Sequence, residues 1–87
     1  MELSYHYETM SLEDHQNLAV PVGDGGNYHR LIGMNDTGLY LFDLLRKNFT
    51  EREIVERMSL KYDIPREAMA KDVRKGIQEL LEMGALK

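Results

Sequence analysis

The second half of this chain contains three segments that each begin with residues that cap α-helices. Thr50 is followed three residues later by Glu53, a capping box in which each side chain satisfies a backbone N–H at the helix start. Asn35 or Asp36 can cap an earlier helix, and Pro65 suits the first turn of a later one. The predicted helices cover about residues 36–47, 51–61 and 65–83.

Each predicted helix also carries apolar side chains on one face. In the last helix the apolar residues are four, four and three positions apart, so they share one side. Gly84 supplies a left-handed stop after this helix, and Leu86 is expected to dock on the core. The apolar positions are Leu39, Leu41, Phe42, Leu44 and Leu45 in the first helix, Ile54, Val55 and Met58 in the second, with Leu60 and Tyr62 near its end, and Met69, Val73, Ile77 and Leu80 in the third.

The part of the chain before these helices favours short strands. Residues 5–12 are rich in aromatic residues and Thr, and residues 18–23 form an apolar run in which Pro21 suggests a strand end or an edge. The glycine-rich residues 23–27 are expected to turn the chain into a third strand over residues 28–34. We therefore predict an α+β fold for a single domain over residues 1–87. It would be winged helix-turn-helix-like, with a three-stranded antiparallel N-terminal sheet packed on three α-helices.

Composition narrows the class of protein further. The chain has no cysteine, which excludes disulfides and thiolate metal sites. No apolar run approaches the roughly 18 to 20 residues of a membrane span, and no signal peptide is legible, so we expect a cytoplasmic protein. The net charge is −4, all of it carried by residues 1–49. This acidic balance argues against general nucleic-acid binding, which needs clustered Lys and Arg.

Catalytic and metal-binding motifs are not indicated. His6, His15 and His29 show no metal-ligand spacing on one element, so we interpret them as surface or strand-face residues. The glycine-rich residues 23–27 lack the Lys-Ser/Thr of a phosphate-binding loop and precede a strand pattern. We expect no enzyme activity, no catalytic residue, no metal and no cofactor.

The last predicted helix leaves a DNA-binding alternative open. Its face opposite the apolar stripe carries basic and amide side chains of the kind that a recognition helix presents to a major groove. Acidic residues, Glu67 and Glu82, lie beside them, which favours an ordinary solvated face. The side chains in question are Lys71, Arg74, Lys75 and Gln78.

Several short motifs follow one another in an order and spacing that is more specific than any one of them. They are Pro21-Val22-Gly23, the glycine-rich loop, Asn35-Asp36-Thr37-Gly38 after Met34, Tyr62-Asp63-Ile64-Pro65, Asp72-Val73, Leu80-Leu81 and Gly84. Together they resemble the PqqD-like family, relatives of coenzyme PQQ synthesis protein D that are also described as RiPP recognition elements. The resemblance covers the chain from about Tyr5 to Leu86.

Two positions depart from the pattern of the family. Met34 stands where Leu usually precedes the Asn, which is a conservative difference. Gly76 stands where a larger apolar side chain is common, and glycine inside a helix costs on the order of 1 kcal/mol relative to alanine. Its missing side chain is expected to leave a notch on the helix.

The resemblance implies a peptide-binding adaptor. In that family the leader of a ribosomally made precursor peptide adds as a fourth strand beside the third strand and lies against the third helix. The partners implied are the leader peptide and a peptide-modifying enzyme such as a radical SAM enzyme. Carried onto this sequence, the contact residues would be Tyr28, His29, Arg30, Leu31 and Ile32 on the strand and Asp72, Lys75, Gly76 and Glu79 on the helix.

Within this predicted site, Arg30 and Lys75 would meet an acidic leader residue, and Leu31 or Ile32 an apolar one. One of Leu31 and Ile32 is also expected to face the core. An exposed edge strand can instead pair with its own copy, so a homodimer stays open as an alternative.

Overall fold

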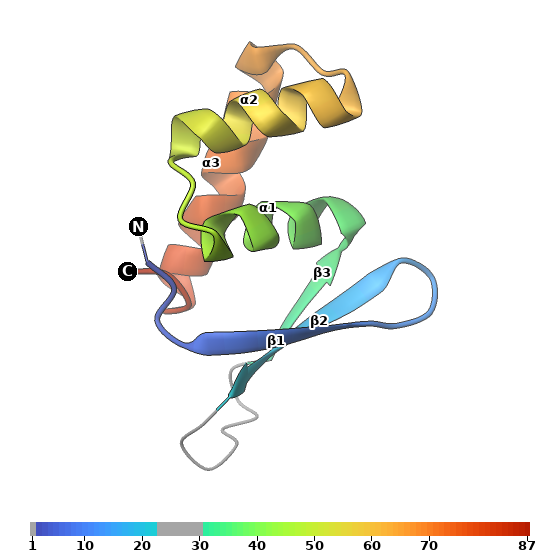
Figure 1. Cartoon of the computed structure of the whole chain (residues 1–87), viewed down its shortest axis with the longest axis vertical. Helices are drawn as coiled ribbons and strands as arrows, with labels where there is room; N and C mark the ends of the chain where they lie inside the picture. Colours follow the sequence, from blue (N-terminus) through green and yellow to red (C-terminus); the bar gives the residue numbers. More distant parts are fainter. Residues whose placement is uncertain (1, 23–30) are drawn as a thin grey trace.

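The computed structural model describes residues 2–22 and 31–87. Within these ranges the chain forms three strands followed by three helices (Figure 1). The strands are β1 (His6–Ser11), β2 (Gln16–Val22) and β3 (Ile32–Asn35), and the helices are α1 (Asp36–Arg46), α2 (Glu51–Tyr62) and α3 (Arg66–Glu82). The predicted α+β architecture, an antiparallel three-stranded sheet followed by three helices, is confirmed.

The sheet has the order β1-β2-β3, with β2 paired antiparallel to both neighbours. The β1–β2 hairpin turns on Asp14 and His15, whose φ angles are 56° and 58°. Positive φ at both central residues is the conformation of a type I′ turn, whose twist matches that of a hairpin. Because the turn is this short, Gln16 and Asn17 belong to β2, and the predicted start at residue 18 is two residues late.

Strand β3 leads directly into α1. It ends at Asn35, one residue later than predicted, and Asn35 is also the N-cap of the helix. Its side-chain oxygen accepts a hydrogen bond from the backbone N–H of Gly38 at 2.8 Å. β3 starts at Ile32, so Leu31, which was predicted to belong to the strand, lies before it, and residues 28–30 of the predicted strand lie outside the described residues. The short junction fixes the direction of α1 relative to the edge of the sheet.

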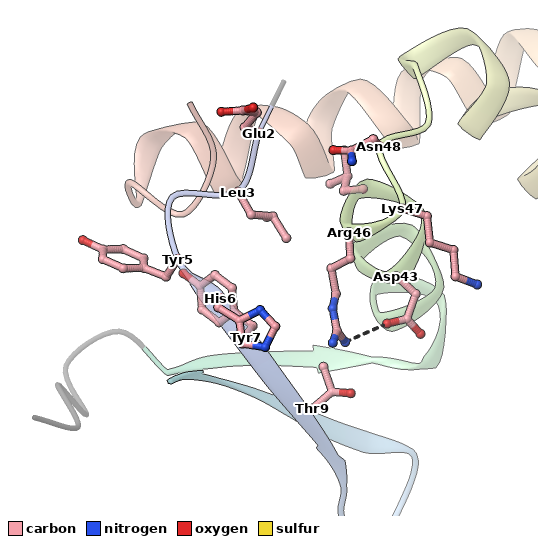
Figure 2. Close-up of a pocket in the computed structure, with 11 residues that line it drawn as sticks. Glu2, Leu3, Tyr5, His6, Tyr7, Thr9, Asp43, Arg46, Lys47 and Asn48 are labelled. Atoms are coloured by element: carbon pink, nitrogen blue, oxygen red, sulfur yellow. Dashed lines mark hydrogen bonds and ion pairs between the residues drawn. The ribbon is translucent and has the colours of Figure 1, made fainter. Parts of the chain in front are cut away.

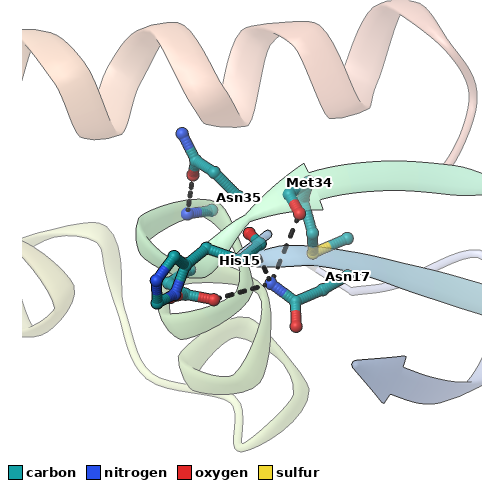
Figure 3. A network of polar contacts seen from close by, with 6 residues as sticks. His15, Asn17, Met34 and Asn35 are labelled. Carbon is teal, nitrogen blue, oxygen red and sulfur yellow. Dashed lines mark hydrogen bonds and ion pairs between the residues drawn. The ribbon is translucent and has the colours of Figure 1, made fainter. Parts of the chain in front are cut away.

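A polar network ties the β1–β2 turn to this junction (Figure 3). The side-chain amide of the buried Asn17 donates to Asp36 Oδ1 at 3.0 Å and to the carbonyl oxygen of Met34 at 3.4 Å. Nδ1 of His15 lies 2.7 Å from Asp36 Oδ2. The hydrogen bond from Asn17, followed by that with His15, lowers the pKa of the Asp36 carboxyl below its ordinary value of 3.8. The ionised carboxylate is therefore the form that the network stabilises.

The core lies where one face of the sheet meets the helices, and α1 lies between the sheet and α2 (Figure 1). Tyr7 of β1 packs edge to face on Phe42 of α1, with ring centroids 5.2 Å apart. The predicted apolar stripe of α3 is confirmed, because all four of its members are buried: Met69, Val73, Ile77 and Leu80.

Two apolar residues of the helices, one of them predicted to lie on an apolar face, lie outside this core. Leu60 of α2 is 85% exposed, because it follows the buried Met58 by two residues and so points about 200° around the helix from it. Leu39 of α1 is only half-buried and does not belong to the core cluster. The capping residues therefore predicted where these helices begin and end, whereas the apolar pattern did not predict the burial of every apolar residue.

The two ends of the described chain, near Leu3 and Leu86, lie side by side (Figure 1). Gly84 adopts φ +78°, the left-handed stop predicted for it, and Leu86 is buried as expected, with 4% of its surface exposed. Leu86 forms a β-bridge with Leu3, and the backbone N–H of Lys87 donates to the carbonyl oxygen of Glu2 at 2.7 Å. The C-terminal residues therefore close over the start of the chain.

Candidate functional site

A groove runs between β3 and α3, and its first part lies against the strand. This strand pocket has a volume of about 120 Å³. Its lining is mostly apolar, with a single carboxylate, Glu79, on α3. The side chains that line it include Ile32 and Met34 of β3, Leu41 of α1, Leu80 of α3 and Met83, the C-cap of α3. An extended chain beside β3 would find apolar contacts here.

The second part of the groove, the helix pocket, lies between α1 and α3 with Met58 of α2 also in its lining, and has a volume of about 280 Å³. Asp72 and Lys75 of α3 line it, together with Thr37 of α1. The two pockets adjoin, since four residues line both of them: Gly38, Leu41, Gly76 and Glu79. They therefore form one groove with an apolar part near the strand and a charged part farther along α3.

The boundary between the pockets is a contact between Leu41 and Gly76. A Cβ atom on Gly76 would lie only 2.6 Å from Cδ2 of Leu41, well inside the van der Waals distance. The glycine therefore leaves no empty notch, contrary to the sequence-based expectation, because Leu41 packs into the space that a side chain would need. The groove owes its shape to this close approach of α1 and α3.

The predicted helix residues Asp72, Lys75, Gly76 and Glu79 all line the helix pocket. On the strand side, Ile32 lines the strand pocket but is only 7% exposed, so it is the residue that faces the core. Leu31 is 42% exposed and lies in neither pocket. The remaining three predicted residues, Tyr28, His29 and Arg30, lie outside the described residues.

The charges along the groove differ from those on the rest of α3. Asp72, Lys75 and Glu79 are exposed, and none of them has an ion-pair partner among the described residues. Arg74, by contrast, lies 3.5 Å from Glu51 of α2, which partly neutralises the face proposed for DNA. The described part of the chain gives the DNA-binding alternative no support.

Comparison with known proteins identifies the family. The sequence matches the family model of coenzyme PQQ synthesis protein D (PqqD) over residues 9–86. The chain belongs to the PqqD family. No curated protein matches this PqqD-family chain. Its structure is similar to that of TbiB1 in complex with the TbiA(beta) leader peptide, with a TM-score of 0.79, 18% sequence identity, and coverage of 100% of this chain and 95% of that chain.

Several groove residues of this PqqD-family chain were not predicted from the sequence. Met83 had a detectable signal, since Asp72, Gly76, Glu79 and Met83 are spaced by four, three and four residues and share one helical face. Leu41 and Met58 carried no sequence signal for a place in the groove, because both belong to the apolar stripes of other helices. Which core residues also border a groove depends on how the helices pack.

A larger hollow, of about 870 Å³, lies at the opposite edge of the sheet (Figure 2). The N-terminal segment, β1 and the end of α1 surround it. Its charged side chains have both signs, and Arg46 is already held 3.3 Å from Asp43. In the groove beside β3, by contrast, the charges have no ion-pair partner among the described residues and stand next to an apolar lining.

The described residues contain neither a membrane-spanning helix nor a cluster of metal ligands. None of their helices has the length and apolar character needed to cross a bilayer. Over residues 2–22 and 31–87, no three His, Asp or Glu side chains are grouped so that they could hold a metal ion.

Proposed function

We propose that this PqqD-family protein is a cytoplasmic, non-catalytic adaptor that binds the leader of a ribosomally made precursor peptide. The observation that carries the proposal is the groove between β3, at the edge of the sheet, and α3. TbiB1, which shares the fold, has been solved in complex with a leader peptide. In our proposal the leader adds as a fourth strand beside β3 and rests against α3.

In strand addition, the peptide backbone supplies affinity and its side chains supply selectivity. The edge of β3 offers backbone donors and acceptors that any extended peptide can use, so these hydrogen bonds supply affinity without sequence preference. Selectivity then comes from side chains that alternate along the peptide and enter the pockets. The apolar strand pocket and the charged helix pocket supply two different environments for them.

The adaptor would act by bringing its peptide to a peptide-modifying enzyme, for which we propose a radical SAM enzyme. Binding both partners raises the effective concentration of the peptide at the enzyme without any chemical group from the adaptor. Omitting the adaptor should therefore slow modification at low peptide concentration and matter less when the peptide is in excess.

The proposal can be tested by titrating isotope-labelled protein with a synthetic leader peptide from a precursor gene beside its own. Amide NMR signals of both β3 and α3 should shift. Alternate β3 amides should also gain protection from hydrogen exchange, because only every second N–H points to the free edge of an antiparallel strand. Signals that move only outside β3 and α3 would contradict strand addition at this site.

The edge of β3 can also pair with a second copy of the chain, so peptide binding would compete with self-association. A concentration series in size-exclusion chromatography, with and without peptide, separates the two. A dimer that dissociates when peptide is added would indicate that both use the same edge.

A further inference from the structure

The two pockets of the groove are spaced in a way that fits an extended peptide. The residues of α3 and its C-cap Met83 that line them are centred four to five positions apart, which at a helical rise of 1.5 Å per residue is about 7 Å. Two residues of an extended strand span nearly the same distance, at about 3.3 Å each. Side chains two residues apart point to the same side of a strand. Adjacent inward-facing side chains of one bound strand that runs along α3 can therefore occupy the two pockets.

The two pockets differ in the side chain that they would accept. The strand pocket is lined by the buried Ile32 and Leu80 and by the exposed Met83, with Glu79 at its border to the helix pocket. The helix pocket has apolar contacts deep in its lining, Met58 and Val73, which are 2% and 1% exposed. Above them stand the exposed charged side chains of α3.

The charges of the helix pocket favour a cation. Asp72 and Glu79 place two carboxylates along it against the one ammonium of Lys75, and the whole chain carries a net charge of −4. A long basic side chain could lay its methylene stem on the apolar lining and bring its charged head to a carboxylate. Glu79 is the carboxylate best placed, because it borders both pockets.

We propose that the leader recognised here carries a large apolar residue for the strand pocket and, two residues away, a lysine or arginine whose head pairs with Glu79 in the helix pocket. This reverses the sequence-based expectation of an acidic leader residue near Lys75. The inference rests on the proposed function, since it assumes a peptide strand along β3, and it adds the class of residue that the groove selects.

The test uses a random peptide library displayed on phage and selected on the full-length protein. Enriched peptides should share an apolar residue and a basic residue two positions apart. One enriched peptide is then synthesised with Lys and with the neutral Met at the basic position, and both are titrated by fluorescence anisotropy. We expect the Lys peptide to bind about two- to fivefold more tightly, with a difference that shrinks as salt is added.

Matched variants of α3 test whether Glu79 is the side chain that causes the preference for a basic peptide residue. Glu79→Gln should abolish the difference between the Lys and Met peptides, and Glu79→Lys should reverse it by favouring a Glu peptide. Glu82→Gln is the control, because Glu82 is an exposed carboxylate of the same helix that lines neither pocket. It should keep the wild-type preference. Thermal unfolding of each variant checks that the fold is intact.

The outcomes separate this inference from the function on which it rests. Peptides that shift the β3 and α3 amides but show no basic preference, or a preference that Glu79→Gln leaves unchanged, overturn the inference and leave the proposed function standing. Selected peptides that leave the amides of both elements unmoved overturn the two together.

Discussion

At the scale of single residues, the groove depends on a side chain that is missing from α3 and one that is present on α1. Gly76 lets Leu41 approach so closely that a Cβ atom would overlap its terminal methyl group. Leu41 is only 7% exposed, yet it lines both pockets. A substitution at Gly76 would therefore act on the groove through Leu41.

Gly76→Ala should weaken peptide binding more than it changes stability. Alanine favours the helix by about 1 kcal/mol over glycine, and forcing an extra methyl group into a packed site costs about 1 to 3 kcal/mol. The atom in the way is the end of a flexible side chain, so Leu41 can move toward the groove. We expect the free energy of unfolding, measured in urea, to change by about 1 kcal/mol or less while peptide affinity falls.

Leu41→Val provides the matched control, since valine has no Cδ2 atom to meet the new methyl group. The double variant Gly76→Ala/Leu41→Val should regain part of the lost affinity. Wild-type peptide affinity in Gly76→Ala alone would show that Leu41 does not limit the groove.

Because of Asp36, the free energy of unfolding should depend on pH at acidic pH. Its pKa is lowered in the folded state by the hydrogen bonds with Asn17 and His15, so the folded state binds its proton less readily than the unfolded chain. This contribution is fully present above the ordinary value of 3.8 and is lost as the pH falls through the lower folded-state pKa. The comparison is urea unfolding of the wild type and Asp36→Asn across this range. The difference between the two should shrink as the pH falls, and a constant difference would contradict the assignment.

At the scale of elements, the helices were predictable because their ends are encoded locally. The capping box at the start of α2 is formed as predicted, with the Glu53 N–H donating to Thr50 Oγ1 at 3.2 Å and the Thr50 N–H donating to Glu53 Oε1 at 2.9 Å. These contacts join residues three positions apart, so the sequence alone displays them. The same holds for Asn35 at α1 and Gly84 after α3.

Thr50→Ala should destabilise the protein by about 1 kcal/mol, because it removes the acceptor for a backbone N–H at the helix start. Thr50→Ser keeps the oxygen and should cost little. Urea unfolding measures both. Equal losses in the two variants would assign the effect to the methyl group of Thr50 and not to the cap.

The strands and the groove were less predictable, because they depend on contacts between distant residues. The start of β2 was misplaced because Asp14 and His15 adopt positive φ without the glycine that usually announces such a turn. In the groove, the predicted α3 residues do lie together, but their role stays a prediction. Leu41 and Met58 could not be foreseen, since nothing in an apolar stripe tells which member will border an opening.

At the scale of the whole molecule, the last residues complete the core as well as ending the chain. The backbone N–H groups of Ala85 and Leu86 both donate to the carbonyl oxygen of Leu80, at 2.9 and 3.2 Å. This turn carries Leu86 to the core and to its bridge with Leu3. Stability therefore depends on a leucine only one residue from the end of the chain.

Leu86→Ala should lower the free energy of unfolding by about 2 to 4 kcal/mol, the usual cost of truncating a buried leucine. Leu60→Ala makes the same chemical change at a site that is 85% exposed, and should alter stability by no more than about 0.5 kcal/mol. Thermal unfolding of both variants gives the comparison. Similar losses at the two sites would mean that Leu86 contributes no more than a surface residue.

The first and last described residues are hydrogen-bonded to each other, so the two ends of the described chain are neighbours in space. The N–H of Ser4 reaches the carbonyl oxygen of Ala85 at 2.8 Å, so a short flexible linker could join the two ends without moving either. A circular permutant opened at the exposed β1–β2 turn would keep the pairing of β3, α1 and α3 that forms the groove. Through the same pair of neighbouring ends, the fold could be inserted into a surface loop of another protein.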